Sequence, residues 1–267
     1  MIGISDLEYL CAEVRQIARK AGAFLCDERQ KFDQERVEEK SAHNYVSYVD
    51  KESERRLIEQ LSTLLPGAGF IAEEGSGSLT DEEYCWVIDP LDGTTNYSQG
   101  LPIFTVSIGL QCKGETVLGV VYAPYLNELY EACKGKGAML NGRSIHVSGK
   151  NDTQESVVST GFPIDKDRNP DNNLDNLARI LPMVRGVRRQ GSAAFDLCCV
   201  AAGILDGYWE FNLHLWDVCA GILIVTEAGG TVRSFREDRN VPIVVGTPAI
   251  VEQLYPRLSD KPGKICL

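Results

Sequence analysis

Two aspartates three residues apart, Asp89 and Asp92, are the residues of this chain whose type and spacing point most directly to chemistry. They lie in the segment 86–96, which reads WVIDPLDGTTN. An apolar, β-branched run from Cys85 to Ile88 precedes them and predicts a buried strand. Pro90 cannot donate a ladder hydrogen bond, so the strand is expected to stop abruptly there. Both carboxylates should then lie at the mouth of that strand.

Two carboxylates held this close repel each other, and each resists ionising unless a cation lies nearby. Mg²⁺ prefers carboxylate oxygens and leaves positions for water and substrate phosphate. The next residues, Gly93, Thr94 and Thr95, predict a turn whose backbone N–H groups could bind an anion at the start of a helix. A cation site and a phosphate site would then adjoin. The alternative is an ordinary turn at a strand end, where Asp, Pro and Gly are common.

Two further acids stand beside apolar segments. Glu73 follows the short apolar run 70–72, and Asp217 lies in the first turn of an apolar helix. At a helix N-terminus an acid can simply complement the helix dipole, which is the alternative for Asp217. If the four acids converge, they could hold two cations roughly 3.5–4 Å apart, which stabilise the attacking and leaving oxygens of a phosphoryl transfer. Asp89 would bridge the two cations.

Three other charged residues have a less specific signal. Glu210 follows Trp209 on a short predicted strand, so it is either solvated or a polar substrate contact. Lys40 and Arg189 could help to bind phosphate, although isolated basic residues usually lie on the surface.

The elements that must position these residues follow from periodicity and breakers. The first half predicts two amphipathic helices followed by meander-like antiparallel strands, and the second half predicts two buried apolar helices among further strands. Helices are expected at 5–26, 50–65, 174–184, 193–205, 215–228 and after Pro248; an exposed charged segment at 27–40; strands at 70–72, 85–88, 103–111, 116–123, 128–133, 156–160, 208–211, 232–235 and 243–245.

Composition narrows the class of protein. The 267 residues are 43% hydrophobic and 24% charged, as in an ordinary globular protein, and the net charge of −11 argues against nucleic-acid and anionic-membrane partners. The nine cysteines form neither a disulfide framework nor a zinc motif, so free thiols are expected. Acids interrupt the N-terminus and no apolar stretch could span a bilayer, so we expect a cytoplasmic protein.

The quoted segments together resemble the inositol monophosphatase family of Mg²⁺-dependent, lithium-sensitive phosphatases. The matching segments are 70–74, 86–96, 120–124, 134–138, 141–142, 215–217 and 227–230. The resemblance implies an αβαβα layered sandwich formed by one domain, 1–267. The sequence itself has no obvious linker, and 142–150 is expected to be a seam between a half at 1–145 and a half at 146–267. The resemblance also implies a homodimer.

The resemblance implies a role for each site residue. Glu73, Asp89 and the Leu91 carbonyl would hold one Mg²⁺, and Asp89, Asp92 and Asp217 a second; a third, weaker ion would use Glu73. The N–H groups of Gly93 and Thr94, with Thr95 beside them, would bind phosphate. Asp50 and Thr94 would relay a proton from the attacking water, which Glu73 positions. Ala193, Glu210 and Asp217 would contact the inositol hydroxyls.

The implied reaction is hydrolysis of myo-inositol monophosphate by direct attack of an activated water, without a phosphorylated enzyme. The segment 93–96 favours this branch, because branches that act on nucleotide bisphosphates or histidinol phosphate tend to carry Lys after the first Thr. Segments 161–163 and 188–194 resemble bacterial and archaeal members, several of which also accept fructose 1,6-bisphosphate. That substrate, another sugar or nucleotide phosphate, and a non-catalytic regulatory protein on the same fold remain the alternatives.

Overall fold

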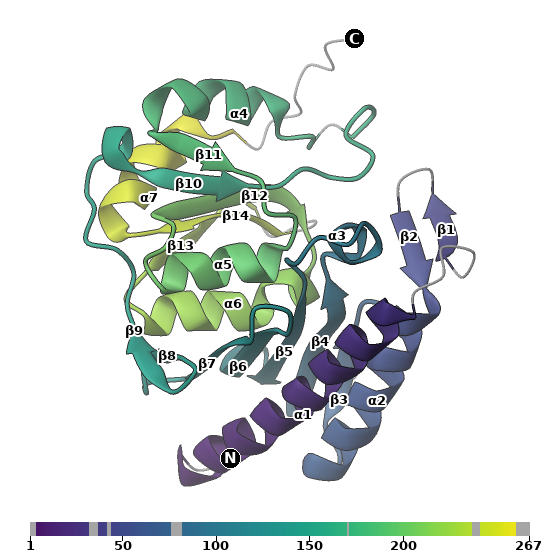
Figure 1. The fold of residues 1–267 in the computed structure, drawn as a ribbon. Helices are drawn as coiled ribbons and strands as arrows, with labels where there is room; N and C mark the ends of the chain where they lie inside the picture. The colour runs from purple at the N-terminus through teal and green to yellow at the C-terminus, as the bar shows by residue number, and fades with distance from the viewer. Residues whose placement is uncertain are drawn as a thin grey trace.

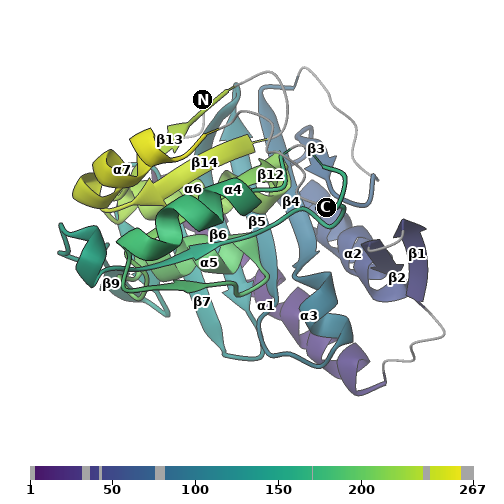
Figure 2. The same ribbon diagram turned by 90° about the horizontal axis from the view of Figure 1, so that it is seen from above.

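The computed structural model describes residues 4–31, 37–41, 44–75, 82–169, 171–236 and 241–259. These residues form five layers, in the order helices, sheet, helices, sheet, helices (Figure 1). The turned view in Figure 2 places α1 and α2 on one side of the molecule and α7 with β13 and β14 on the other. The predicted αβαβα sandwich is confirmed. Among the described residues, no helix has the length and apolar character needed to cross a membrane.

The first layer consists of α1 (Ile4–Gln30) and α2 (Tyr48–Leu64). Both helices bury apolar side chains at three- and four-residue spacing, including Val14 and Leu57, against one face of the larger sheet. In the chain, the hairpin of β1 (Val37–Ser41) and β2 (Asn44–Ser47) follows α1 and precedes α2. The segment expected to be exposed at 27–40 is therefore partly helix and partly strand, and residues 32–36 lie outside the described part.

The larger sheet has seven strands in sequence order, β3 to β9. The pair β3–β4 is parallel and every later pair is antiparallel, which confirms the predicted meander. Its strands are β3 (Gly69–Ala72), β4 (Tyr84–Asp92), β5 (Thr105–Cys112), β6 (Glu115–Ala123), β7 (Glu128–Cys133), β8 (Ala138–Leu140) and β9 (Arg143–Ile145). The last two, three residues each, are too short to show a two-residue alternation in the sequence.

The central layer consists of α5 (Ala193–Ala201) and α6 (Leu215–Glu227), which lie between the two sheets (Figure 1). Every residue of α5 is buried, as its uniform apolarity predicts. α5 ends at Ala201 and not at Leu205 as predicted, because a turn with Gly203 at φ 69° follows it. α6 rests closely on the larger sheet: a Cβ at Gly119 would lie 2.8 Å from the Ala220 carbonyl oxygen. This contact shows that the middle of α6 packs directly on β6.

The second sheet has five strands in the order β11-β10-β12-β14-β13, with parallel and antiparallel pairs. Two helices and a separate apolar cluster cover its outer face. The strands are β10 (Val157–Thr160), β11 (Gly186–Arg188), β12 (Gly207–Leu213), β13 (Thr231–Ser234) and β14 (Val241–Gly246). The helices are α4 (Leu174–Ile180) and α7 (Pro248–Leu254), with 3₁₀ turns at Thr153–Glu155, Leu181–Met183 and Tyr255–Arg257. One further short helix, α3 (Thr94–Ser98), follows β4 of the larger sheet in the chain.

Candidate active site

A β-bulge places Asp89 and Asp92 on one face of the larger sheet. β4 does not stop at Ile88 as predicted; it continues through Pro90 to Asp92. Asp89 pairs with Ser107 and Asp92 with Thr105, so three residue steps on β4 match two on β5. On a regular strand, residues three apart point to opposite faces. The extra residue at Pro90 restores a common direction, and a bulge is also where a strand tolerates proline.

The face that carries both aspartates is the one toward α5 and α6. The Ser107 hydroxyl donates to the Trp216 carbonyl at 3.4 Å, and the Thr105 hydroxyl lies 3.3 Å from the Ser192 hydroxyl. Glu73 reaches the same region by a different route. Because β3 runs parallel to β4 with Ala72 opposite Ile88, the residue after β3 lies beside Asp89.

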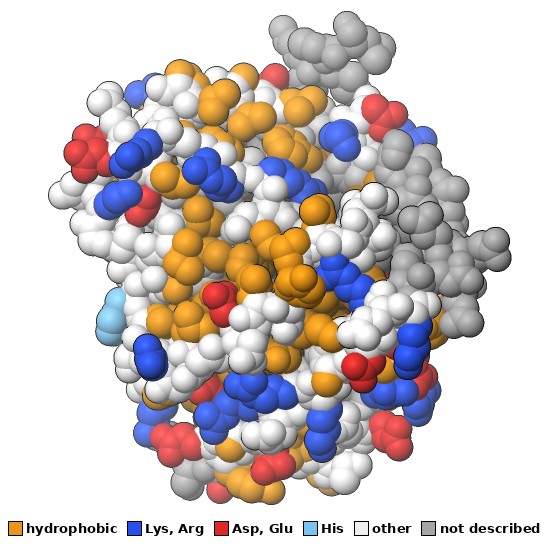
Figure 3. All heavy atoms as spheres, in the orientation of Figure 1, with side chains coloured by type: hydrophobic (Ala, Val, Ile, Leu, Met, Phe, Trp, Pro, Cys, Tyr) orange, Lys and Arg blue, Asp and Glu red, His pale blue; other side chains and the backbone are white. Residues whose placement is uncertain are grey.

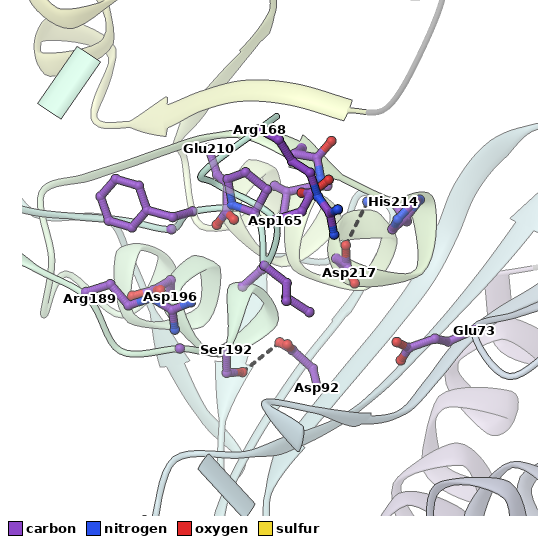
Figure 4. Close-up of a pocket in the computed structure, with 18 residues that line it drawn as sticks. Glu73, Asp92, Asp165, Arg168, Arg189, Ser192, Asp196, Glu210, His214 and Asp217 are labelled. Carbon is purple, nitrogen blue, oxygen red and sulfur yellow. Dashed lines mark hydrogen bonds between the residues drawn. The ribbon is translucent and has the colours of Figure 1, made fainter. Parts of the chain in front are cut away.

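Asp92 forms a bridge to the second half of the chain. Its Oδ2 accepts a hydrogen bond from the Ser192 hydroxyl at 2.6 Å (Figure 4). The same oxygen accepts a second hydrogen bond from the Ala194 N–H at 2.8 Å. The Ser192 hydroxyl also accepts a bond from Phe195 N at 3.2 Å and so caps α5. The carboxylate of Asp92 therefore lies at the positive end of the α5 dipole, which favours a negative charge.

Asp217 lies in the first turn of α6, as predicted. Its Oδ2 accepts a hydrogen bond from the His214 N–H at 2.7 Å, one half of a capping box (Figure 4). The His214 ring stacks on Trp216 with centroids 4.7 Å apart. The helix-terminus role considered for Asp217 is thus real, and the same side chain also faces the site cavities described next.

Two adjoining cavities lie between the halves of the molecule, with volumes of about 390 Å³ and about 510 Å³. Glu73, Asp92 and Asp217 line both, and Figure 4 shows these three acids on the walls of one cavity. Asp89 and Leu91 line the larger cavity. The four acids expected to act together therefore share one region, although they come from the turn after β3, from β4 and from α6.

Burial is the main cause that raises the pKa values of these acids, and neighbouring carboxylates add to the rise for Asp89 and Asp217. Burial raises the pKa of Asp89 well above its usual value of 3.8, and the nearby charges of Glu73, Asp92 and Asp217 add to the rise. Burial also raises the pKa of Asp217, with Asp92 as the largest charged contribution. The pKa of Asp92 rises to about 6 through burial, against the opposing effect of its hydrogen bonds to Ser192 and Ala194. The carboxylates of this site therefore carry more negative charge than the neighbouring N–H and hydroxyl donors neutralise.

The turn after Asp92 lines the larger cavity with Gly93, Thr94 and Thr95. Gly93 has φ 94° and precedes α3, and no side chain caps that helix within the described residues. A Cβ at this position would lie 3.1 Å from the Ile103 carbonyl oxygen, so only glycine fits without displacement. The Thr94 hydroxyl donates to the Leu91 carbonyl at 3.1 Å. The predicted anion-binding turn therefore faces the acids across the same space.

The smaller cavity has a wall of polar groups from the second half. Ala193 and Glu210 line it, as does Arg189, which also lines the larger cavity. The Tyr208 hydroxyl donates to Glu210 Oε2 at 2.6 Å. Burial raises the pKa of Glu210 to about 7. A carboxyl group near neutrality can both donate to and accept from a substrate hydroxyl.

Sequence reasoning missed several groups that line these cavities, among them Ser192, Asp196, Arg168 and the segment 162–164. Asp196 had a usable signal, because it is the single acid in an otherwise apolar helix. It accepts a hydrogen bond from Gln190 Nε2 at 2.8 Å, and burial raises its pKa to about 8. The others carry no comparable local signal.

Asp50, which was named from the sequence, is not among the described residues that line the cavities. Asp50 is buried in the first turn of α2, where its charge contributes to the raised pKa of Tyr97 on α3. Its pairing with Thr94 stays a prediction. Lys40 belongs to β1, and its side chain lies outside the part of the chain that the structure describes.

The donor set suits a hard divalent cation in its chemistry: four carboxylates and the Leu91 carbonyl surround one space, and their mutual repulsion is what such a cation removes. Across the described residues, no three His, Cys, Asp or Glu side chains lie close enough to hold one ion as they stand. Asp89, Asp92 and Asp217 instead accept hydrogen bonds from neighbouring N–H and hydroxyl groups. The residues therefore fit the ion by their chemical type.

Comparison with known proteins gives a consistent result. The sequence profile of the inositol monophosphatase family matches residues 6–260. The chain is 41% identical over 254 residues to Nus factor SuhB of Pasteurella multocida, covering 91% of this chain and 95% of that one. It is 41% identical over 240 residues to the fructose-1,6-bisphosphatase/inositol-1-monophosphatase of Aquifex aeolicus, covering 89% and 91%.

The fold has close solved counterparts. The structure of inositol monophosphatase from Anabaena (Nostoc) sp. PCC 7120 superposes with a TM-score of 0.85 at 35% identity, covering 98% of this chain and 99% of that chain. The profile match, the two relatives and this structure all extend over most of the sequence, so they include both halves and all four acids. The chain belongs to the inositol monophosphatase family.

Proposed function

We propose that this protein is a Mg²⁺-dependent phosphomonoesterase that hydrolyses myo-inositol monophosphate to inositol and phosphate. The observation that carries the proposal is the convergence of Glu73, Asp92 and Asp217, from three separate elements, on the same two cavities. Membership of a phosphatase family supports the reaction class. The polar wall formed by Glu210 and its neighbours supports a substrate rich in hydroxyl groups.

The proposed roles follow from where each group lies. Glu73, Asp89, Asp92, Asp217 and the Leu91 carbonyl would hold two or three Mg²⁺ ions, which supply an activated water and stabilise the leaving oxygen. The N–H groups of the turn at 93–95 would bind the phosphate oxygens. Thr94 is placed by its bond to the Leu91 carbonyl, so its hydroxyl stays beside that phosphate site.

The wall opposite the acids would orient the alcohol part of the substrate. Glu210 is fixed by Tyr208 and can exchange a hydrogen bond with a ring hydroxyl. Ala193, which is 9% exposed, leaves room for the ring to approach the start of α5. Alignment of a bound ester against the acids is worth a large share of the rate enhancement in reactions of this type.

Phosphate release from a panel of esters tests the proposal. Purified protein is incubated with myo-inositol 1-phosphate, fructose 1,6-bisphosphate and a nucleoside monophosphate, each with Mg²⁺ and with a chelator. We expect release that requires Mg²⁺ and is fastest with the inositol ester. Failure of the folded protein to release phosphate from any ester in Mg²⁺ would contradict it.

A second candidate is a regulatory binding protein on the same fold. The observation that favours it is the high identity to a relative named Nus factor SuhB. The Asp89→Asn variant separates the candidates. A catalytic role fails in this variant, whereas a purely regulatory role persists because the fold and its surface are retained.

We also propose that the protein forms a homodimer. Figure 3 shows apolar side chains gathered at the centre of one face, between the two sheets and ringed by polar and charged groups. A contiguous apolar area of this kind is typical of an association surface. Light scattering after size-exclusion chromatography measures the mass in solution, and a monomer at micromolar concentration would contradict this proposal.

A further inference from the structure

Two cysteines far apart in the sequence meet on the side of the larger sheet covered by α1. Cys11 lies on α1 and Cys133 ends β7, and each is 7% exposed. Both line a separate cavity of about 200 Å³ whose other walls include Arg15, Glu131 and Met139. Met139 is 37% exposed, so one wall of the cavity lies at the protein surface.

The backbone of each element directs its cysteine sulfur into the space between α1 and β7. A helical side chain leans over the turn that precedes it, so Cys11 covers the carbonyl of Leu7, one turn earlier. The Cys133 Sγ lies 3.6 Å from that same Leu7 carbonyl oxygen. On β7, Glu131 and Cys133 are two residues apart and share a face, and the Cys11 Sγ lies 3.5 Å from Glu131 Oε2. Both thiols therefore lie in the same space between α1 and β7.

Two charged groups beside the pair, Arg15 and Glu131, act on the Cys133 pKa in opposite directions: Arg15 lowers it and Glu131 raises it. Arg15 contacts Glu131 through Nε and Nη1, each at 3.2 Å, which places a guanidinium at the cavity wall. The contact between the two sulfurs, with burial, raises the pKa of Cys11, and the same contact lowers the pKa of Cys133. Cys133 is thus the better nucleophile and Cys11 the thiol that follows it.

We propose that Cys11 and Cys133 form a reversible disulfide site, closed by a low-molecular-weight disulfide and reopened by a low-molecular-weight thiol. The bond would tie α1 to β7 across a loop of more than a hundred residues. This site is distinct from the acidic cavities, since none of its residues lines them.

The chemistry balances with oxidised glutathione as the oxidant. The Cys133 thiolate attacks one glutathione sulfur, which breaks the glutathione S–S bond and releases one glutathione thiolate. The Cys11 sulfur, after losing its proton to solvent, attacks the Cys133 sulfur of the mixed disulfide and releases the second glutathione. The two protein thiols lose two electrons and two protons, and one glutathione disulfide becomes two thiols.

Peptide mapping of the whole folded protein tests this site. Fully reduced protein is incubated with oxidised glutathione without denaturant, alkylated, digested and analysed under non-reducing conditions. We expect one peptide pair linked through Cys11 and Cys133, a mass loss of about 2 Da from two hydrogens, and a higher unfolding temperature that dithiothreitol reverses.

Matched variants locate the effect. Cys133→Ser should abolish the linked peptide and the temperature shift, whereas Cys26→Ser, on the same helix but outside the cavity, should keep both. The wild-type map needs no variant, so a folding defect in either one leaves the test intact. Recovery of Cys11 and Cys133 unlinked, or as two separate glutathione adducts, would overturn the proposal.

Discussion

The larger sheet and the central helices supply the candidate site in different ways. On the sheet, Asp89 and Asp92 come from one strand end and a bulge sets their direction. On the helices, Asp217 and the partners of Asp92 lie at N-termini, where backbone N–H groups and the helix dipole hold a carboxylate. The sheet side therefore depends on the backbone path, and the helix side depends on capping. We therefore expect substitutions on the sheet side and on the helix side to change activity and stability in different proportions.

The largest effect is expected from Asp89→Asn on the sheet side. The amide keeps an oxygen for the Leu91 N–H, which Asp89 Oδ1 accepts at 2.9 Å, but it removes the charge that would bind a cation. Loss of several kcal/mol of transition-state stabilisation lowers kcat/KM by about 10³-fold or more. The unfolding temperature should not fall, because a crowded charge has been removed. Steady-state assays and thermal unfolding measure both; near-normal turnover would refute the role of Asp89.

The next largest effect is expected from Gly93→Ala. The new Cβ would meet the Ile103 carbonyl oxygen at 3.1 Å while the backbone is held at φ 94°. We expect a loss of about 1–3 kcal/mol in unfolding free energy, with reduced activity. Gly114→Ala is the control, because Gly114 has φ 82° and open space around it. Equal losses of activity in the two variants would show that the turn does not need its close packing.

On the helix side, Asp196→Asn should change the pH dependence of stability. With a pKa of about 8 when folded and 3.8 as its ordinary value, Asp196 holds a proton in the folded state that the unfolded state has lost. Its contribution is therefore present at low pH and is lost as pH rises through about 8. From about pH 6 to about pH 8 the wild type should lose about 2 kcal/mol more than the variant. Denaturant titrations at both pH values measure this; parallel curves would contradict it.

The smallest effect is expected from Ser192→Ala. This change removes the cap of α5 and one hydrogen bond to Asp92, at a cost of about 1–2 kcal/mol in unfolding free energy. Thr247→Ala removes the corresponding cap of α7, away from the cavities, and serves as the control. Both variants should lose stability, and only Ser192→Ala should lose activity, several-fold. An equal loss of activity in the control would mean that capping alone explains the result.

The sequence reveals local chemistry well and distant contacts poorly. The acids, the glycine turn and the helix carrying Asp217 follow from neighbouring residue types, and the structure places them in one region. The bonds from Ser192 and Ala194 to Asp92 join residues about a hundred positions apart, and no local pattern encodes them. The family resemblance, and not periodicity, supplied the layered order of the sheets.

The errors in the strand and helix assignments have physical reasons. Pro90 normally ends a ladder, but here it occupies a bulge where its missing N–H costs little. Strands β8, β9 and β11 have only three residues each, so tertiary contacts and not propensity create them. The apolar pattern around Asp196 predicts only a buried helix, so it gives no sign that this acid lines a cavity.

The bulge at Pro90 makes the count of residues between Asp89 and Asp92 a constraint of its own. Side-chain direction along a strand depends on odd or even position, so removing one residue there would send Asp92 or Asp89 to the opposite side of the sheet, into the apolar layer under α1 and α2. No exchange of one amino acid for another produces that error. Chain length in this short stretch is therefore under tighter restriction than the identity of most residues around it.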